Sequence, residues 1–261
     1  MTDLELIVDA ALEAGELAAT LRRRGLKIEY KEADRTPVTN ADLAADALLT
    51  ERLRAARPDY GWLSEETTDD DERLTRKRLF VVDPIDGTRA FLNDKPWWAV
   101  SIGVVEGQRP IAGVVFAPQL AETYAAVAGQ GATLNGRPIR PSLATAIKDC
   151  GMVADARLFT LPHWPTPWPA MRVEQRNSTA YRMCLVASGA FDAAVTLIPS
   201  HDWDLAAADL IAGEAGCFVG NHAGAAFVYN QARPMQANLV CTAPGLAPLI
   251  LERLSHIAAP A

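Results

Sequence analysis

A six-residue stretch combines the residue types that can bind a divalent cation and a phosphate group. It is Asp83-Pro84-Ile85-Asp86-Gly87-Thr88, and it follows the apolar run Leu79-Phe80-Val81-Val82, which predicts a buried strand that ends at Asp83. Pro84 disfavours helix at the residue before it, and Asp86-Gly87 permits a sharp turn, with Asp86 able to cap a helix that begins at Gly87. Carboxylates beside the free amides of a helix start suit Mg²⁺ and a phosphate ester. An ordinary Asp-Gly turn after a strand is the alternative interpretation.

Three further acidic sites stand at the predicted ends of elements. Glu65 and Glu66 follow the apolar residues of a short strand, and Asp42 lies in the first turn of a predicted helix. Asp204 opens a helix that begins with small alanines. Each site has a plainer interpretation: a solvated surface pair for the glutamates, helix N-terminal stabilisation for Asp42, and an N-cap for Asp204. Taken separately, none of the three requires a catalytic role.

Four motifs occur in order along the chain, and together they indicate a family. They are Val38-Thr39-Asn40-Ala41-Asp42, Ser64-Glu65-Glu66, Asp83-Pro84-Ile85-Asp86-Gly87-Thr88 and Trp203-Asp204-Leu205-Ala206-Ala207. With these motifs the sequence resembles the inositol monophosphatase superfamily, which includes the inositol monophosphatases and the phosphatases of 3′-phosphoadenosine 5′-phosphate. The resemblance extends from about Lys31 to Gly216 and also covers residues 113–118 and 184–189.

The resemblance implies a fold of the α+β or α/β class, with five alternating layers of helices and sheets (αβαβα). The metal site would lie between two halves. Residues 1–145 would form an N-terminal α+β half that carries most metal ligands, and residues 146–261 a C-terminal α/β half that supplies Asp204 and substrate contacts. Family members are commonly homodimers, so the resemblance also implies a homodimer.

The resemblance implies a metal-ligand set as well. A first Mg²⁺ would be held by Glu65, Asp83 and the backbone carbonyl of Ile85, and a second by Asp83, Asp86 and Asp204. A third ion would lie near Glu65 with mostly water ligands. Mn²⁺ is a possible substitute, and Li⁺ is expected to inhibit. Phosphoryl transfer needs this kind of charge neutralisation more than covalent help from the protein.

The remaining catalytic roles follow from the same match. Thr88 and Asp42 match the residues that orient the attacking water, with Glu65 beside them. The amides of Gly87 and Thr88 match the phosphate cradle, where Asp86 and Asp204 are also expected. The sequence contains no GxSxG motif and no cysteine in a catalytic-looking context. Direct attack by a metal-activated water, without a phosphoenzyme, is therefore the expected mechanism.

The substrate is less closely specified than the reaction. Inositol monophosphatases carry a glutamate seven residues before the aspartate of the Trp-Asp motif, and Leu197 stands there in this chain. Residues 63–66 and 86–91 look closer to the 3′-phosphoadenosine 5′-phosphate phosphatase branch, although Asn177 departs from both branches. Arg176, Ser178 and Arg182 are candidate substrate contacts; the arginines could contact a second phosphate or merely cap and solvate a helix.

The favoured prediction is therefore a Mg²⁺-dependent phosphomonoesterase that resembles the 3′(2′),5′-bisphosphate nucleotidases. An inositol monophosphatase, or another sugar or histidinol phosphate phosphatase, is the alternative. A non-catalytic phosphate-binding homologue is a rival of another class. Lys31 matches a mobile-loop lysine of the inositol monophosphatases but could be a plain surface lysine, and Trp97-Trp98 could line a substrate mouth, form a dimer contact or belong to the core.

Composition excludes several other classes of protein. The 261 residues are 49% hydrophobic and 22% charged, as in a soluble globular protein. A net charge of −7 without a basic stripe argues against a nucleic-acid polymer as partner. No apolar run approaches the ~20 residues of a membrane span. The four cysteines lack CxxC spacing and are predicted to be buried, reduced thiols, and the N-terminal residues are acidic, so a cytoplasmic location is expected.

Hydrophobic periodicity predicts helices and strands that could position these residues. Helices are expected over residues 3–24, from Thr39 or Asn40 to about 58, and over 178–188, 204–213 and 248–257. Strands are expected over 99–105, 111–117, 122–127 and 133–139, in an antiparallel meander with a turn at Asn135-Gly136. Further strands are expected over 150–154, 193–197, 217–219 and 237–242.

Overall fold

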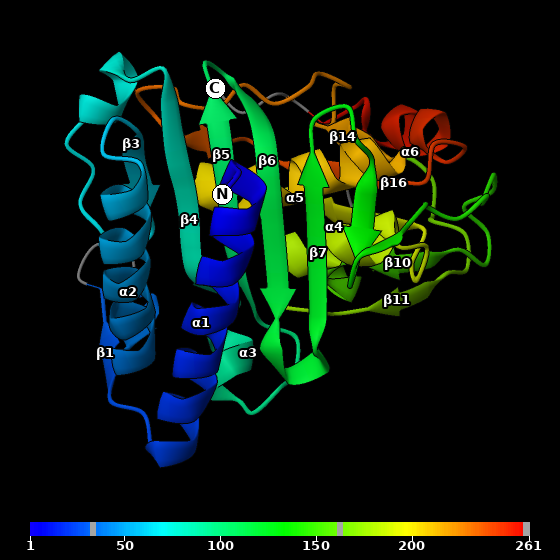
Figure 1. The fold of residues 1–261 in the computed structure, drawn as a ribbon. Coiled ribbons are helices and arrows are strands. Elements are labelled where there is room, and N and C mark those ends of the chain that lie inside the picture. Colours follow the sequence, from blue (N-terminus) through cyan, green and yellow to red (C-terminus); the bar gives the residue numbers. More distant parts are fainter. Residues whose placement is uncertain (32–34, 161–163, 258–261) are drawn as a thin grey trace.

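Five stacked layers make up the computed structural model, which describes residues 1–31, 35–160 and 164–257 (Figure 1). The helices α1 (Asp3–Arg24) and α2 (Asn40–Ala56) lie on one face of a seven-stranded sheet, and α4 (Thr179–Ala187) and α5 (Asp202–Ala215) lie on the other. A five-stranded sheet covers the far side of α4 and α5, and α6 (Ala247–Leu254) packs on its outer face. The predicted αβαβα arrangement is confirmed.

The larger sheet carries the predicted meander. Its strands, in spatial order, are β3 (Gly61–Ser64), β4 (Arg78–Asp86), β5 (Ala99–Glu106), β6 (Arg109–Ala117), β7 (Glu122–Val127), β8 (Ala132–Leu134) and β9 (Arg137–Pro138). The pair β3–β4 is parallel, whereas the other neighbours are antiparallel. The last expected strand is interrupted at the predicted Asn135-Gly136 turn. Because β3 and β4 run parallel, their carboxyl ends meet at one edge of the sheet.

The smaller sheet mixes parallel and antiparallel pairs. Its order is β11 (Arg172–Glu174), β10 (Gly151–Val153), β12 (Ala193–Thr196), β16 (Leu239–Thr242) and β14 (Phe218–Gly220). Two small ribbons pair β1 (Ile28–Tyr30) with β2 (Pro37–Thr39), and β13 (Ser200–His201) with β15 (Met235–Gln236). The short helices are α3 (Thr88–Leu92), η1 (Glu72–Thr75), η2 (Pro118–Leu120) and η3 (Ala156–Thr160). The strand β11 has no counterpart among the predicted elements. The predicted division at residue 145 stays a prediction.

Small residues bring α5 close to the larger sheet. A Cβ atom on Gly113 of β6 would stand 2.8 Å from the carbonyl oxygen of Ala207, and one on Gly103 would stand 3.3 Å from the Ala206 Cβ. The alanines that follow Asp204 in α5 therefore allow the close packing that the sequence predicts. A larger side chain at either glycine would push the helix away from the sheet. This contact fixes the height of Asp204 above the strands.

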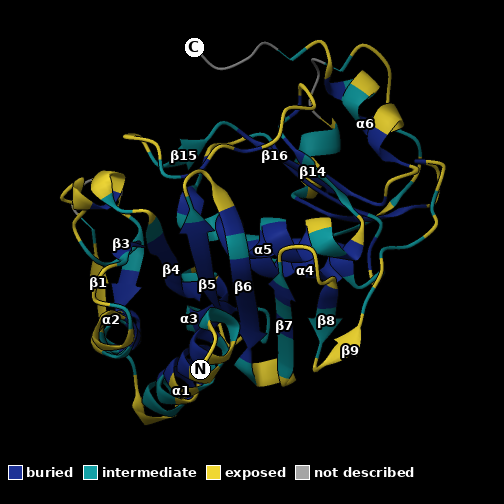
Figure 2. Ribbon diagram, turned by 45° about the horizontal axis from the view of Figure 1, so that its top comes forward, coloured by how far each residue is buried: buried dark blue, intermediate teal, exposed yellow. Residues whose placement is uncertain are grey.

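The core lies between the layers, as Figure 2 shows by the buried strands and the exposed outer turns of α1 and α2. Leu6, Ile7 and Leu49 pack from α1 and α2 against Phe80 and Val82 of β4, as the 3.6-residue pattern predicts. The other face of the sheet packs against α4 and α5. Of the four cysteines, all are free, and Cys217 alone is partly exposed. The prediction that the cysteines are reduced thiols therefore agrees with the structure. The prediction that they are buried holds for three of the four cysteines.

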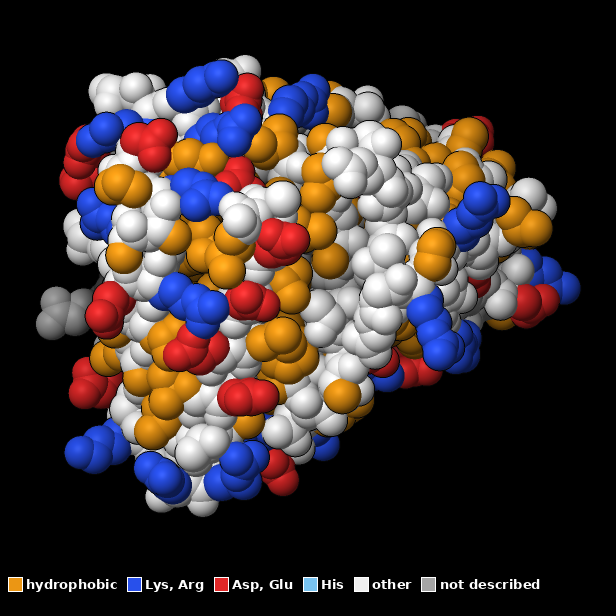
Figure 3. Space-filling model, in the orientation of Figure 1, with side chains coloured by type: hydrophobic (Ala, Val, Ile, Leu, Met, Phe, Trp, Pro, Cys, Tyr) orange, Lys and Arg blue, Asp and Glu red, His pale blue; other side chains and the backbone are white. Residues whose placement is uncertain are grey.

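The outer surface over α1 and α2 carries charges of both signs. Figure 3 shows lysine and arginine side chains interspersed with aspartate and glutamate on this face, with apolar patches between them. Among the described helices, none is long and apolar enough to cross a membrane. The charge on this face is therefore mixed, as is usual for a solvated surface.

Candidate active site

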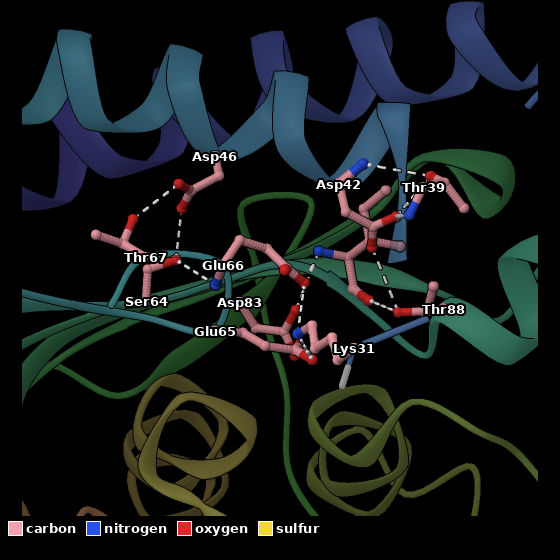
Figure 4. Close-up of polar contacts among 11 residues, drawn as sticks. Lys31, Thr39, Asp42, Asp46, Ser64, Glu65, Glu66, Thr67, Asp83 and Thr88 are labelled. Carbon is pink, nitrogen blue, oxygen red and sulfur yellow. Dashed lines mark hydrogen bonds and ion pairs between the residues drawn. The ribbon is translucent and has the colours of Figure 1, made fainter. Parts of the chain in front are cut away.

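The parallel pair β3–β4 delivers two acidic residues to one edge of the larger sheet. Glu65 follows the last residue of β3, and its amide donates a hydrogen bond to the Val82 carbonyl at 3.2 Å. Asp83 lies next to Val82 on β4 and is buried. The adjacent carboxyl ends thus place Glu65 beside Asp83, and Figure 4 shows both side chains in the space between the helical layers.

The strand β4 does not end at Asp83, as the sequence predicts, but continues to Asp86. Its pairing with β5 shifts register between Asp83 and Asp86, which is the signature of a bulge. The Asp83 carboxylate accepts a hydrogen bond at 3.0 Å from the amide of Ile85. Pro84 lies within this irregularity and needs no ladder hydrogen bond there. The bulge allows Asp83 and Asp86 to approach the same point.

The prediction that Asp86 caps the helix after Gly87 is wrong. The N-cap of α3 is Gly87, at φ 91°, and no side chain caps that helix. Asp86 instead accepts hydrogen bonds from the amides of Thr179 (3.0 Å) and Ala180 (2.7 Å) and from the Ser178 hydroxyl. It therefore caps α4, an element 92 residues further along the chain. A cap across such a distance leaves no local signal in the sequence.

Asp204 comes from the layer opposite the strands. The helix α5 begins at Asp202, so that its N-cap is His201 and Asp204 is not the N-cap. The Asp204 carboxylate accepts the His201 amide at 2.8 Å, in the reciprocal arrangement of a capping box. One carboxylate oxygen from each of Asp83, Asp86 and Asp204 lies within 4.8 Å of the other two. Two elements, β4 and α5, thus direct three carboxylates to one point, and those of Asp83 and Asp86 are buried.

Burial and mutual repulsion strongly affect these acids. Burial raises the pKa of Asp83 well above its usual range, and the charges of Glu65, Asp86 and Asp204 raise it further. Burial likewise raises the pKa of Asp204, together with the charge of Asp86. The pKa of Asp86 rises only to about 6, because its hydrogen bonds from α4 oppose the effect of burial. Clustered, buried carboxylates of this kind need a compensating positive charge.

The donor set fits a hard divalent cation. All the converging atoms are carboxylate oxygens, the ligands that Mg²⁺ prefers, and the cluster contains no sulfur or nitrogen donor. The backbone carbonyl of Ile85, between the two aspartates in the sequence, lies 3.2 Å from the Thr88 hydroxyl. The residues can therefore hold Mg²⁺, as the sequence predicts for Asp83, Asp86 and Asp204.

A second group of polar residues lies beside the acid cluster, on the side of α2. Thr39 caps α2, and the Asp42 carboxylate accepts the Thr39 amide at 2.8 Å. The Thr88 hydroxyl lies 3.4 Å from the same carboxylate (Figure 4). Burial raises the pKa of Asp42, although the bonds from Thr39 oppose it. Asp42, Thr88 and Ile85 are thus joined by one hydroxyl.

Glu65 and Glu66 share a lysine. The Lys31 ammonium lies 2.9 Å from Glu65 and 3.0 Å from Glu66. Burial, together with the charge of Glu65, raises the pKa of Glu66 to about 7, despite the opposing charge of Lys31. Lys31 is therefore not a plain surface lysine: it supplies the positive charge nearest to these two glutamates in the described part of the chain.

The residue that supports this glutamate loop is not among the predicted site residues. Asp46 of α2 is buried and accepts hydrogen bonds from the hydroxyl of Ser64 and, at 2.9 Å, from that of Thr67 (Figure 4). In the sequence, Ser64 precedes the two glutamates and Thr67 follows them. Asp46 lies one helical turn after Asp42, and both positions face the sheet. That four-residue spacing was the signal in the sequence, but an acid on a helix has many plainer explanations.

A pocket of about 830 Å³ opens beside Asp204. Arg176 and Arg182, two predicted substrate contacts, lie on its wall with Leu197. Ser178 does not: it is fully buried, and its hydroxyl is committed to Asp86 beneath the pocket. Trp98 belongs to the core, where it packs against Phe91. Trp97 is partly exposed and lies under the Arg176 guanidinium, 4.3 Å from the ring centre.

Comparison with known proteins assigns this architecture to a family. Residues 2–258 match the inositol monophosphatase family. The chain belongs to that family. One relative is a histidinol-phosphatase of Chlorobaculum parvum, which is 36% identical over 83% of this chain and 85% of its own length. Another is a 3′(2′),5′-bisphosphate nucleotidase CysQ of Aggregatibacter actinomycetemcomitans, which is 31% identical over 82% of each chain.

Solved structures of the inositol monophosphatase family share the fold. The IMPase of Thermotoga maritima superimposes with a TM-score of 0.84 at 27% identity, over 98% of this chain and 97% of its own. The predicted family is thereby confirmed, and the predicted class, a phosphoric monoester hydrolase, agrees with the names of the relatives. Because those names refer to different phosphate esters, the substrate must be argued from the pocket.

Proposed function

We propose that this protein is a Mg²⁺-dependent phosphomonoesterase that hydrolyses a small phosphorylated metabolite by direct attack of water. The observation that carries the proposal is the convergence of the Asp83, Asp86 and Asp204 carboxylates within 4.8 Å of one another. Three acids with raised pKa values are an unfavourable arrangement unless a cation binds there. Their position beside the Thr88–Asp42 pair supports a catalytic rather than a purely structural cation site.

Each acidic residue receives a role in this proposal. Glu65, Asp83 and the carbonyl of Ile85 would hold one ion, Asp83, Asp86 and Asp204 a second, and a third would lie near Glu65. When bound, Mg²⁺ would supply the positive charge that stabilises the transferring phosphoryl group. Mn²⁺ would substitute for it, and Li⁺ would inhibit. The amides of Gly87 and Thr88, at the start of α3, would hold the phosphate oxygens together with Asp86 and Asp204.

Thr88 and Asp42 would position the water. The Thr88 hydroxyl can donate its proton to Asp42 and accept a hydrogen bond from a water molecule on its other side. Burial raises the pKa of Asp42, which makes its carboxylate a better proton acceptor. Thr39 holds that carboxylate in place through its amide. A proton from the water can therefore pass through the hydroxyl of Thr88 to Asp42.

Among the substrates of this family, we favour a nucleoside 3′(2′),5′-bisphosphate. Leu197, which cannot accept a hydrogen bond from a sugar hydroxyl, lies on the pocket wall, and the same pocket contains four arginines against two aspartates: Arg89, Arg157, Arg176, Arg182, Asp155 and Asp204. A basic pocket suits an anionic leaving group. An inositol phosphate remains the second candidate, and an IMPase of Staphylococcus aureus has been solved with inositol monophosphate and with 2′AMP.

Phosphate release from a panel of esters tests the proposal. The panel contains adenosine 3′,5′-bisphosphate, inositol 1-phosphate, histidinol phosphate and fructose 1,6-bisphosphate, each assayed with Mg²⁺ and with a chelator. Adenosine 3′,5′-bisphosphate should have the highest kcat/KM, and only with Mg²⁺. Preference for inositol 1-phosphate would overturn the substrate assignment alone. Metal binding in calorimetry without turnover of any ester would instead support a non-catalytic phosphate-binding protein.

The oligomeric state and the location of the protein are also proposals. We infer a homodimer from the family, to be measured by light scattering of the purified protein. The four free cysteines support a reducing compartment such as the cytoplasm.

A further inference from the structure

Arg182 is a buried cation whose donors are largely unused. Its residue is 8% exposed, and its guanidinium donates through Nη2 to the Thr179 hydroxyl at 3.0 Å. Its Nε lies buried without an acceptor among the described residues. A guanidinium carries five N–H donors in a planar fork, and leaving them unpaired in a buried position is unfavourable. Arg182 nevertheless lies on the wall of the pocket beside Asp204, where a ligand could supply the missing acceptors.

The nearest carboxylates do not use up the charge of Arg182. Asp86 and Asp204 are the acids whose charges act on it, yet neither lies within ion-pair distance of the guanidinium in the described structure. Asp86 already accepts hydrogen bonds from the start of α4, and Asp204 accepts one from His201. Both acids also belong to the proposed cation site, where a bound cation would offset their charge. Arg182 would then be a cation without a counter-charge.

The helix α4 holds Arg182 at a fixed place relative to the acid cluster. The amides of Thr179 and Ala180 bind Asp86, and Arg182 follows Ser178, the N-cap, by four residues, which is about one helical turn. The pocket extends from Asp204 to Arg182. A small molecule with its reacting phosphate at the acids could therefore bring a second anionic group to this arginine.

The other walls of the pocket limit the kind of molecule that can bind there. Two of the three other arginines that line the pocket have partners: Arg176 pairs with Glu174 and covers Trp97, and Arg157 pairs with Asp155. An apolar wall stands among them, made of Leu158, Val195, Leu197, Ile198, Pro199 and Ile257. Ile198 is 71% exposed and so offers free apolar surface. Such a pocket suits a planar or apolar group that carries an anion, and disfavours an ammonium group or a polyol.

We propose that Arg182 is a specificity-determining residue that binds the second phosphate of a bisphosphorylated nucleotide, whose base lies on the apolar wall around Leu197 and Ile198. The assignment rests on the proposed phosphatase activity. It predicts discrimination between adenosine 3′,5′-bisphosphate and adenosine 3′-monophosphate, which differ only in the second phosphate.

The test compares kcat/KM for these two substrates in the wild type and in Arg182→Met, which keeps the apolar stem of the side chain and removes its charge. The ratio, bisphosphate over monophosphate, should fall roughly ten- to hundredfold, as expected for the loss of charge-assisted hydrogen bonds. Arg76→Met is the matched control, because it removes an arginine charge outside this pocket, at a side chain that is 38% exposed and paired with Glu72; it should change the ratio less than about twofold.

A second measurement separates recognition from a structural role. Calorimetry should show that the wild type binds adenosine 5′-phosphate more tightly than adenosine, and that Arg182→Met removes this difference. If Arg182 served only to balance Asp86 and Asp204, both substrates would lose activity equally and the ratio would stay unchanged, which would overturn the proposal. Absence of Mg²⁺-dependent release from either substrate would overturn the phosphatase itself, while the calorimetry would still test Arg182. Should Arg182→Met not fold, Arg182→Lys keeps the charge without the fork: a smaller fall in the ratio is expected, and an unchanged ratio counts against the proposal.

Discussion

Two neighbouring regions of this protein contain charged groups of opposite sign that lack sufficient counter-charge. Where the carboxyl ends of β3 and β4 meet the start of α5, the buried acids Asp83 and Asp86 and the partly buried Asp204 lie close together, and desolvation and the neighbouring carboxylates raise the pKa values of Asp83 and Asp204, while desolvation raises that of Asp86. In the pocket beside them, Arg182 is a buried cation with unused donors. The first region needs a cation and the second an anion. A metal-bound phosphate ester with a second anionic group would satisfy both.

The difference between the regions also separates reaction from specificity. The acid cluster is built from strand ends and helix starts that are held by backbone hydrogen bonds, so its geometry depends little on the ligand. The pocket is lined by side chains of several elements, including η3 and β12, and can vary without disturbing the cluster. Relatives named for different phosphate esters are consistent with such a division.

The largest expected effect comes from the acid cluster itself. Asp83→Asn should lower kcat/KM by about a thousandfold or more for every ester, because it removes a ligand oxygen from the proposed centre of the site. Asp94→Asn is the matched control, since its side chain is 97% exposed, and it should retain activity. Turnover of Asp83→Asn at the wild-type rate would sink the metal assignment.

The next effect should come from the Thr88 hydroxyl, which lies beside the Asp42 carboxylate. Thr88→Val keeps the shape of the side chain but can neither orient a water nor relay a proton, so kcat should fall roughly a hundredfold with little change in KM. Thr88→Ser restores the hydroxyl and should recover most of the rate. Steady-state kinetics at saturating Mg²⁺ measure both variants; equal rates for valine and serine would exclude the proposed role.

A weaker effect is expected from the support of the glutamate loop. Ser64→Ala removes one of the two hydroxyls that donate hydrogen bonds to Asp46. The loop that carries Glu65 and Glu66 should therefore be held less firmly. The Mg²⁺ concentration for half-maximal activity should rise by about tenfold, the usual size of an effect on outer-sphere support. Excess Mg²⁺ should restore kcat. A loss that Mg²⁺ cannot restore would point to misfolding rather than to loop positioning.

The smallest effect concerns stability, and here the acid cluster should act against the fold. Since the pKa values of its carboxylates are raised in the folded state, the folded protein binds more protons than the unfolded chain, and stability without metal falls as pH rises through the range from about 4 to above 6. Asp83→Asn mimics a neutral acid. In a chelator it should unfold at higher urea than the wild type at pH 8, by about 1 kcal/mol, with a smaller gain at pH 5.

The pH dependence of that gain is the discriminating readout. A constant difference at both pH values would show that the substitution acts through packing and not through charge. Mg²⁺ should reverse the order of the two proteins at pH 8, because the wild type then gains binding energy that the variant has lost.

Local sequence determined much of the reaction site. The strand before Asp83, the cap of α2 at Thr39 and the small residues after Asp204 follow from periodicity, capping and residue size, which act over a few positions. The motifs that carry Asp42, Glu65, Asp83 and Asp204 were enough to indicate the family and, through it, the five layers. The sequence also showed that Leu197 stands where inositol monophosphatases carry a glutamate.

Only the tertiary structure decided how distant segments meet. It placed Asp86 on the start of α4 rather than on the adjacent α3, brought Lys31 between Glu65 and Glu66, and buried Arg182 at the wall of the pocket. Each of these contacts joins residues from elements far apart in the chain, and depends on strand register and helix packing that no local pattern contains. The sequence could therefore indicate the acids proposed to hold the cation, whereas the arginine proposed to select the substrate emerged only from the folded chain.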